Sequence, residues 1–125
     1  MIVGIGIDTV AIARIAGVWQ RGGERFLRRV YTAAEIAYCL QRAHPAESLA
    51  ARFAAKEAVM KCLGTGWAAG VGFTQVEVVR TPSGAVEVAL HGEAAAVAKA
   101  RGIRAVHLSL THGERDATAF VIAEN

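Results

Sequence analysis

The first residues of the chain alternate between branched apolar side chains and glycine, and this pattern limits how the chain can fold. A β-strand over residues 2–8 would place successive side chains on opposite faces. One face would carry Val3, Ile5 and Ile7, and the other would carry Gly4, Gly6 and Asp8. Glycine weakens a strand, so two glycines on one face indicate close approach of a ligand or of another backbone. Because this face ends in the carboxylate of Asp8, a bound ligand is one explanation for the glycines, and close packing of another backbone is the other.

Length and composition predict one globular domain that spans residues 1–125. The chain is 54% hydrophobic, which is enough for a sizeable core. No apolar run approaches the roughly 18 residues of a membrane span, and the first residues lack a signal-peptide pattern. Cys39 and Cys62 lack C-x-x-C spacing, so we interpret them as buried, reduced thiols. These observations predict a cytoplasmic protein that does not associate with membranes.

Apolar periodicity, caps and turn residues predict a strand, three helices, a hairpin, a fourth helix and a second hairpin. The predicted strands are 2–7, 76–80, 86–90, 106–110 and 118–122. The predicted helices run from a cap at Asp8 or Thr9 to about residue 20, before a Gly-Gly break at 22–23, then from 32 to about 42, from 45 to 63 and from 93 to 101. Thr32 and Glu35 form a capping-box pattern. This order predicts an α+β fold with a small antiparallel sheet and a long central helix.

Positive charge is concentrated in one segment of the chain. The whole chain has a net charge of +3, whereas residues 10–30 contain five arginines and one glutamate, a local excess of +4. These residues are Arg14, Arg21, Arg25, Arg28 and Arg29, with Glu24. An arginine-rich helix favours an acidic partner, such as nucleic acid, anionic lipid or an acidic protein. The alternative is a solvated helix surface.

The helix predicted over residues 49–63 carries charges at its apolar face. At about 100° per residue, Lys56 falls inside the apolar stripe, and Glu57 and Lys61 fall on its border. Charges against a core must be paired, hydrated or bound to a ligand, because burying them alone is costly. The simplest alternative for Glu57 and Lys61 is an i,i+4 ion pair on the helix surface.

A third candidate site lies in residues 106–112. Strand alternation places His107, Ser109 and Thr111 on one polar face. We exclude a serine hydrolase, because no G-x-S-x-G turn is present and neighbours on one strand face do not form a triad. His107 is therefore either a ligand-binding residue or an ordinary hydrogen-bonding residue.

Two carboxylates in separate predicted elements suggest a cation site. Asp8 and Glu57 suit Mg²⁺, which proteins typically hold with one or two carboxylates, together with phosphates and waters. Lys61 and the glycine-rich segment 64–66 would add groups that bind phosphate. The arginine-rich helix that begins next to Asp8 would present an acidic macromolecule to that metal.

Three motifs carry a family resemblance. They are G-I-G-I-D-T-V-A-I-A-R at 4–14, R-F-A-A-K-E-A-V-M-K-C-L-G-T-G at 52–66 and H-L-S-L-T-H at 107–112. Together they resemble the holo-[acyl-carrier-protein] synthase family, the small 4′-phosphopantetheinyl transferases, over essentially the whole chain. The resemblance implies the fold of that family and transfer of 4′-phosphopantetheine from coenzyme A to a serine of apo acyl carrier protein, with release of adenosine 3′,5′-bisphosphate. It also implies a role in fatty acid biosynthesis and a homotrimer with active sites between subunits.

The resemblance further implies a role for each candidate residue. Asp8 and Glu57 would ligate Mg²⁺, and Lys61 would lie at the transferring phosphate; Glu57 is the candidate general base. Coenzyme A would contact Arg52, Lys61, Gly64, Thr65, Gly66 and His107. Arg14 would face the acidic carrier protein, and the local charge adds Arg21, Arg25 and Arg28 or Arg29 to that surface. The glycines before Asp8 would clear space for the metal and pyrophosphate, or allow close packing of the strand.

Two positions depart from the family pattern, and two other functions explain part of the sequence. Residues 83–86 lack a proline expected after the turn, and Asp116-Ala117 lacks a common aromatic residue. A nucleic-acid-binding module would explain the arginines but not Glu57, and its helix lacks interleaved aromatics beyond Trp19 and Phe26. A Mg²⁺-dependent phosphohydrolase would explain the carboxylates but not the basic helix. We therefore expect the transferase, without a nucleic-acid partner.

Overall fold

The computed structural model describes residues 1–65 and 70–125 and has the predicted α+β fold. In chain order the elements are β1 (Ile2–Ala11), α1 (Ile12–Val30), α2 (Ala33–Leu40), α3 (Pro45–Leu63), the 3₁₀ turn η1 (Phe73–Gln75), β2 (Val76–Arg80), β3 (Val86–Leu90), α4 (Gly92–Ala100), β4 (Ala105–His112) and β5 (Asp116–Glu124). Among the helices in these two ranges, none has the length and apolar composition that a membrane crossing needs.

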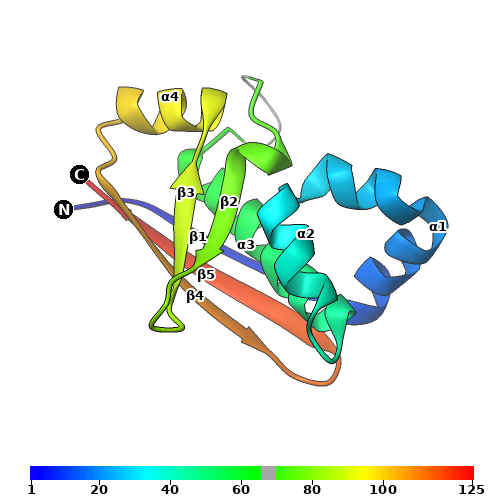
Figure 1. Cartoon of the computed structure of the whole chain (residues 1–125). Coiled ribbons are helices and arrows are strands. Elements are labelled where there is room, and N and C mark those ends of the chain that lie inside the picture. Colours follow the sequence, from blue (N-terminus) through cyan, green and yellow to red (C-terminus); the bar gives the residue numbers. More distant parts are fainter. Residues whose placement is uncertain (66–69) are drawn as a thin grey trace.

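Two antiparallel sheets surround the long helix α3. β5 lies between β1 and β4 in a three-stranded sheet, and β2 pairs with β3 in a separate hairpin. α3 packs along one face of the three-stranded sheet, mainly on β1 and β5, and α1, α2 and β2 also contact it (Figure 1). Of the 19 residues of α3, 13 are buried, and many of them are alanines. These small side chains allow neighbouring elements to approach α3 on several sides, so α3 forms the centre of the core.

β1 and α3 cross with their backbones in contact, which explains the glycine face. A Cβ atom at Gly6 would lie 1.9 Å from the carbonyl oxygen of Ala58, and one at Gly4 would lie 2.7 Å from that of Cys62. Both distances are well below van der Waals contact, so only glycine fits at these positions. Of the two explanations given by the sequence, close approach of another backbone is therefore correct. The space beside the glycines is filled by α3.

The first helix begins later and extends farther than the sequence predicts. Asp8 and Thr9 are paired residues of β1, so the prediction that one of them caps the helix is wrong. α1 begins at Ile12 without a side-chain cap hydrogen bond. The predicted break is present at Gly23, whose φ of 56° is left-handed, but the helix resumes after it. Gly23 therefore divides α1 into a first arm, 12–22, and a second arm, 24–30.

A buried polar network joins α2, α3 and β2. The predicted capping box is present: the Glu35 carboxylate accepts from the Thr32 amide, and the Thr32 hydroxyl accepts from the Glu35 amide. The same carboxylate lies 2.7 Å from the Lys56 ammonium, and both side chains are fully buried. Lys56 also donates to the carbonyl oxygens of Phe73 and Val76. The charge predicted inside the apolar stripe of α3 is thus paired within the protein.

The face of the three-stranded sheet opposite α3 carries an exposed apolar patch on β1 and β5. Ile7 pairs with Phe120, and Ile5 pairs with Ile122. Ile5, Ile7 and Phe120 keep 59%, 56% and 40% of their surface exposed. We call these four residues the open sheet face. A contiguous apolar patch of this kind marks an interaction surface.

Candidate active site

Asp8 and Glu57 come together although they are far apart in the chain. Asp8 lies on the side of β1 that faces α3, two residues after Gly6, and Glu57 precedes Ala58, the residue that Gly6 touches. Lys61, one turn farther along α3, donates to the Asp8 Oδ1 atom at 2.9 Å. In the described part of the chain, Lys61 is therefore paired with Asp8, not with Glu57 as the i,i+4 spacing suggested. The β1–α3 crossing builds a cluster of two carboxylates and one ammonium.

The pKa of Glu57 is raised, mainly by burial and secondly by the charge of Asp8, while Lys61 and Arg14 act in the opposite direction. Two carboxylates held this close repel each other, and a divalent cation would relieve the repulsion. Within residues 1–65 and 70–125, no group of three or more metal-ligating side chains occurs. The pair therefore fits a cation that takes most of its ligands from phosphate and water, as Mg²⁺ does.

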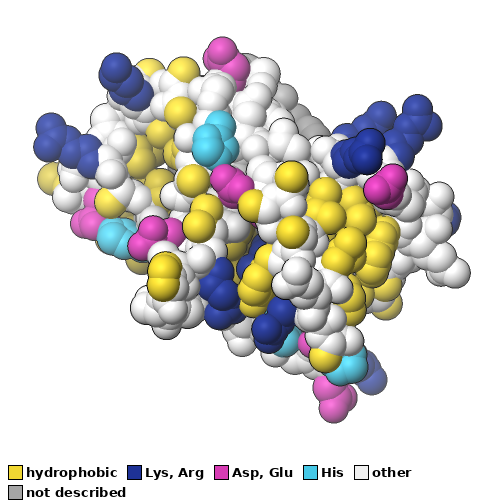
Figure 2. Space-filling model, viewed as in Figure 1, with side chains coloured by type: hydrophobic (Ala, Val, Ile, Leu, Met, Phe, Trp, Pro, Cys, Tyr) yellow, Lys and Arg dark blue, Asp and Glu magenta, His cyan; other side chains and the backbone are white. Residues whose placement is uncertain are grey.

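The arginines of α1 lie on both arms of the kinked helix. Arg14 and Arg21 lie on the first arm, and Arg25, Arg28 and Arg29 lie on the second, all of them exposed. Figure 2 shows basic side chains gathered over the outer end of α1. Because Gly23 separates the arms, these arginines do not form one straight stripe. Arg14 is the member beside the carboxylates: its guanidinium lies over the Phe53 ring, 5.9 Å from the centroid, and its charge acts on Glu57.

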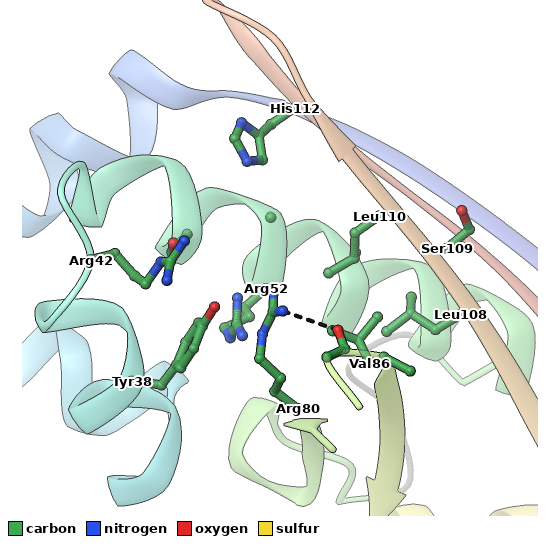
Figure 3. A pocket seen from close by; sticks show the side chains of 13 residues that line it. Tyr38, Arg42, Arg52, Arg80, Val86, Leu108, Ser109, Leu110 and His112 are labelled. Atoms are coloured by element: carbon green, nitrogen blue, oxygen red, sulfur yellow. Dashed lines mark hydrogen bonds between the residues drawn. The ribbon is translucent and has the colours of Figure 1, made fainter. Parts of the chain in front are cut away.

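A basic pocket of about 500 Å³ lies between α2, α3, the β2–β3 turn and β4. The guanidinium groups of Arg42, Arg52 and Arg80 lie 5.5, 4.4 and 5.2 Å from the centroid of the Tyr38 ring (Figure 3). His112 lines the same pocket. In the described ranges, none of the three arginines forms a salt bridge with an acidic side chain. The pocket therefore concentrates positive charge and favours an anion.

Arg52 is the buried member of this pocket. Only 4% of its surface is exposed, and its Nε atom has no hydrogen-bond partner in the structure. A buried polar nitrogen without a partner costs free energy, which an anion bound in the pocket would recover. Arg52 lies five residues before Glu57, so the two side chains point about 140° apart around α3. Within one chain, the basic pocket and the carboxylate pair thus lie on different sides of α3.

The other residues expected to contact coenzyme A lie apart from the carboxylate pair. His107 lies on the outer side of β4, where its ring contacts a carboxylate of β5, whereas Asp8 faces α3 across the same sheet. Gly64 is the left-handed cap of α3, with a φ of 76°, and Thr65 follows it. Gly66 lies outside the described residues. A single chain therefore does not bring His107 next to Asp8.

Sequence reasoning missed most of the basic pocket. Arg52 was a candidate, but Tyr38, Arg42, Arg80 and His112 come from separate segments and share no spacing. Arg42 follows the end of α2 and Arg80 ends β2, positions at which an arginine usually points into solvent. Only the tertiary arrangement around Tyr38 separates these arginines from ordinary surface charges.

Comparisons with known proteins decide the family. The model of the 4′-phosphopantetheinyl transferase superfamily matches residues 4–118. The chain belongs to this superfamily. It is 52% identical, over the full length of both chains, to a holo-[acyl-carrier-protein] synthase of Koribacter versatilis. Among solved structures, the synthase of Neisseria meningitidis matches with a TM-score of 0.92 and 35% identity over 100% of both chains.

A second solved structure adds a ligand. The synthase of Helicobacter pylori in complex with coenzyme A matches with a TM-score of 0.84 and 31% identity, over 96% of this chain and 99% of that one. Together with the full-length relatives, it confirms the predicted family, the fold class and the enzyme class, a phosphopantetheinyl transferase.

Proposed function

We propose that the chain transfers 4′-phosphopantetheine from coenzyme A to a serine of apo acyl carrier protein and releases adenosine 3′,5′-bisphosphate. The observation that carries this proposal is the meeting of Asp8 and Glu57 at the β1–α3 crossing, beside Lys61, in a chain of this superfamily. Coenzyme A bound to the Helicobacter pylori relative supports it as the substrate.

We also infer that the chain acts as one domain in the cytoplasm, in fatty acid biosynthesis. Its described elements pack around one helix, α3, and the relatives match over its full length. Cys39 and Cys62 are free and buried, which is typical of a reducing compartment.

Asp8 and Glu57 would hold the Mg²⁺ ion of the reaction. The interaction between their charges and the partial burial of Glu57 support this assignment. The chemistry supplied by bound Mg²⁺ is neutralisation of the charge that develops on the leaving bisphosphate. The two side chains come from different elements, so the crossing of β1 and α3 determines their spacing.

Glu57 would accept the proton of the carrier serine, and Lys61 would stabilise the negative charge of the phosphate. The carrier serine must lose its hydroxyl proton, and burial makes the Glu57 carboxylate a stronger base than an ordinary glutamate. Lys61 lies one turn along the same helix, where its ammonium would stabilise the oxygens of the transferring phosphate. In this assignment one helix supplies both the base and the phosphate-binding cation.

The complete site would form between copies of the chain, in a homotrimer. Arg52 and Glu57 lie on different sides of α3, and His107 lies on the outer side of the sheet, so one chain does not bring these residues together. The open sheet face offers the surface on which a second copy would pack. Coenzyme A would then contact residues of neighbouring copies: Arg52, Lys61, Gly64, Thr65, Gly66 and His107. The number three rests on the family resemblance.

The acidic carrier protein would dock on α1. Arg14 is the arginine beside Glu57, and Arg21, Arg25 and Arg28 or Arg29 extend the positive surface across both arms. Exposed charges act mainly on the rate of encounter and are screened over about 8 Å at physiological salt. The outer arginines would therefore steer the carrier protein, and Arg14 would orient it at the site.

Mass spectrometry tests the proposed reaction directly. Incubation of the protein with coenzyme A, Mg²⁺ and apo carrier protein should add one phosphopantetheine mass to the carrier serine. Asp8→Asn and Glu57→Gln should each slow the reaction by about 100-fold or more, with unchanged circular dichroism. Near-normal rates for either variant at limiting Mg²⁺ would refute the shared metal site. Phosphate release without a mass gain would instead indicate the phosphohydrolase.

A further inference from the structure

Lys61 contacts the carboxylate of Asp8, one of the two groups that would hold a metal ion at the carboxylate pair. Its ammonium donates to Asp8 Oδ1 at 2.9 Å and to the carbonyl oxygen of Ile7 at 2.9 Å. The Lys61 side chain is 54% exposed, whereas that of Asp8 is 19% exposed. The positive charge of Lys61 thus lies against the less exposed partner and offsets part of the negative charge of Asp8 and Glu57.

We propose that Lys61 is a placeholder for the divalent cation in the ligand-free protein, and that the phosphates of coenzyme A draw it away from Asp8 when the metal enters. The identity of the anion in this inference rests on the proposed function. An ammonium and a metal ion compete for the Asp8 carboxylate, because both are positively charged, repel each other and must approach it to contact distance. Lysine has a flexible stem and freely rotating donors, so an exposed lysine reaches a second anion without movement of the helix.

Positive coupling between metal and coenzyme A follows from this competition. In the free protein, a metal ion must displace Lys61 from Asp8, which lowers the apparent affinity for the metal. When coenzyme A is bound, its phosphates accept the ammonium, so Asp8 is released. By linkage, the metal must tighten coenzyme A binding by the same factor. Metal and coenzyme A therefore bind cooperatively, each strengthening the binding of the other.

Any nearby positive charge would weaken metal binding to some extent by electrostatic repulsion. A variant of Arg14 distinguishes this general repulsion from direct competition for Asp8. Arg14 also carries a positive charge that acts on Glu57, but its guanidinium lies over the Phe53 ring. Its removal lowers the local positive potential without vacating an oxygen of Asp8. Arg14→Met is thus a matched control for Lys61→Met, with the same change in charge and the same new side chain.

Mn²⁺ titration of the full-length protein tests the inference without turnover. Free Mn²⁺ is measured by electron paramagnetic resonance, with and without coenzyme A. In the absence of coenzyme A, Lys61→Met should bind Mn²⁺ about tenfold more tightly than the wild type, whereas Arg14→Met should change the affinity by less than about threefold. Coenzyme A should tighten Mn²⁺ binding by about tenfold or more in the wild type, and by less in Lys61→Met. Lys61→Gln provides a second, uncharged variant that should match Lys61→Met.

Three outcomes decide between the explanations. Equal tightening by Lys61→Met and Arg14→Met would overturn the placeholder role, because general electrostatics would then be sufficient. Unchanged or weaker Mn²⁺ binding by both Lys61 variants would also overturn it, even if the transferase activity were present. If Mn²⁺ binding follows the expected pattern but no carrier protein is modified, the competition stands and the proposed function fails.

Discussion

The Lys56 ammonium lies 2.7 Å from the Glu35 carboxylate, and both side chains are fully buried. Burial lowers the pKa of Lys56, and the charge of Glu35 opposes this change. Lys56 also donates to two main-chain carbonyls near the start of β2, and Glu35 accepts from the Val78 amide. The pair therefore connects α2, α3 and β2 through one network in which the donors and acceptors are satisfied.

Removing one partner of this pair should lower the free energy of unfolding more than removing both charges. Lys56→Met leaves the Glu35 carboxylate buried without a counter-charge, so we expect the free energy of unfolding to fall by about 3–5 kcal/mol. The double variant Lys56→Met/Glu35→Gln should recover a substantial part of this loss, because neither position of the pair then holds an unpaired buried charge. Urea unfolding followed by circular dichroism measures both values. Equal losses in the single and double variants would contradict the prediction.

Gly6→Ala should prevent the β1–α3 crossing. The added Cβ atom would lie 1.9 Å from the Ala58 carbonyl oxygen, so we expect a loss of more than about 4 kcal/mol in the free energy of unfolding. Gly113 provides the control, because a Cβ there would meet nothing within 4 Å. Gly113→Ala should change stability by less than about 0.5 kcal/mol. A Gly6→Ala protein as stable as this control would show that the crossing tolerates a side chain.

Ile7→Lys should disrupt assembly of the chain. Ile7 belongs to the open sheet face and is 56% exposed, so a lysine there would place a charge inside the proposed interface. We expect sedimentation equilibrium to give a lower mass for this variant than for the wild type, and the transfer rate to fall with it. Leu40→Lys replaces a side chain of α2 that is 44% exposed, away from the sheet, and should keep the wild-type mass. A wild-type protein that sediments as an active monomer would refute the interface.

Substitutions of Arg14 and Arg52 should weaken the binding of different partners. Arg14→Ala should weaken carrier-protein binding by about 2 kcal/mol or more if it forms a buried pair with a carboxylate, and should hardly change coenzyme A binding. Arg52→Met should do the reverse, because it removes the buried guanidinium of the basic pocket. Isothermal titration of each variant with each partner measures both affinities. Collapse of coenzyme A binding in Arg14→Ala, with carrier binding intact, would mean that α1 has been assigned to the wrong partner.

Glu77 should make stability depend on pH in acid solution. Hydrogen bonds from Thr32 and from His91 lower the pKa of Glu77. A lowered pKa in the folded protein contributes stability that is present above the unfolded pKa of about 4.3 and is lost as the pH falls through the folded pKa. Glu77→Gln should therefore be less stable than the wild type near neutral pH, and the difference should shrink below about pH 4. Parallel urea titrations across this range measure the difference; a gap that widens on acidification would contradict the prediction.

Features that depend on neighbours in sequence were predictable. The capping box at Thr32 and Glu35 follows from local hydrogen bonding, and the helix end at Gly64 follows from the backbone freedom of glycine. The start of α1 was not predictable in this way. Asp8 and Thr9 suit both a helix cap and a strand, and pairing with β5 decides for the strand.

Ion pairs between residues of different elements were predictable only in part. The charges in the apolar stripe of α3 indicated that each needed a partner, but not which one. Helical spacing suggests that Lys61 pairs with Glu57, and the structure pairs it with Asp8, because β1 lies directly against α3. Likewise, no local pattern connects Lys56 with Glu35, 21 residues earlier. Residue type predicted the need for a partner, and tertiary structure selected it.

The contact between Gly6 and Ala58 has a consequence for protein engineering. Main-chain atoms meet there, so the crossing sets the separation of the Asp8 and Glu57 main chains, and the side-chain rotamers set the remaining distance between the two carboxylates. The β2–β3 turn and α4 lie outside this crossing, so they are the places where substrate or partner preference can be redesigned while the main-chain positions of Asp8 and Glu57 are kept.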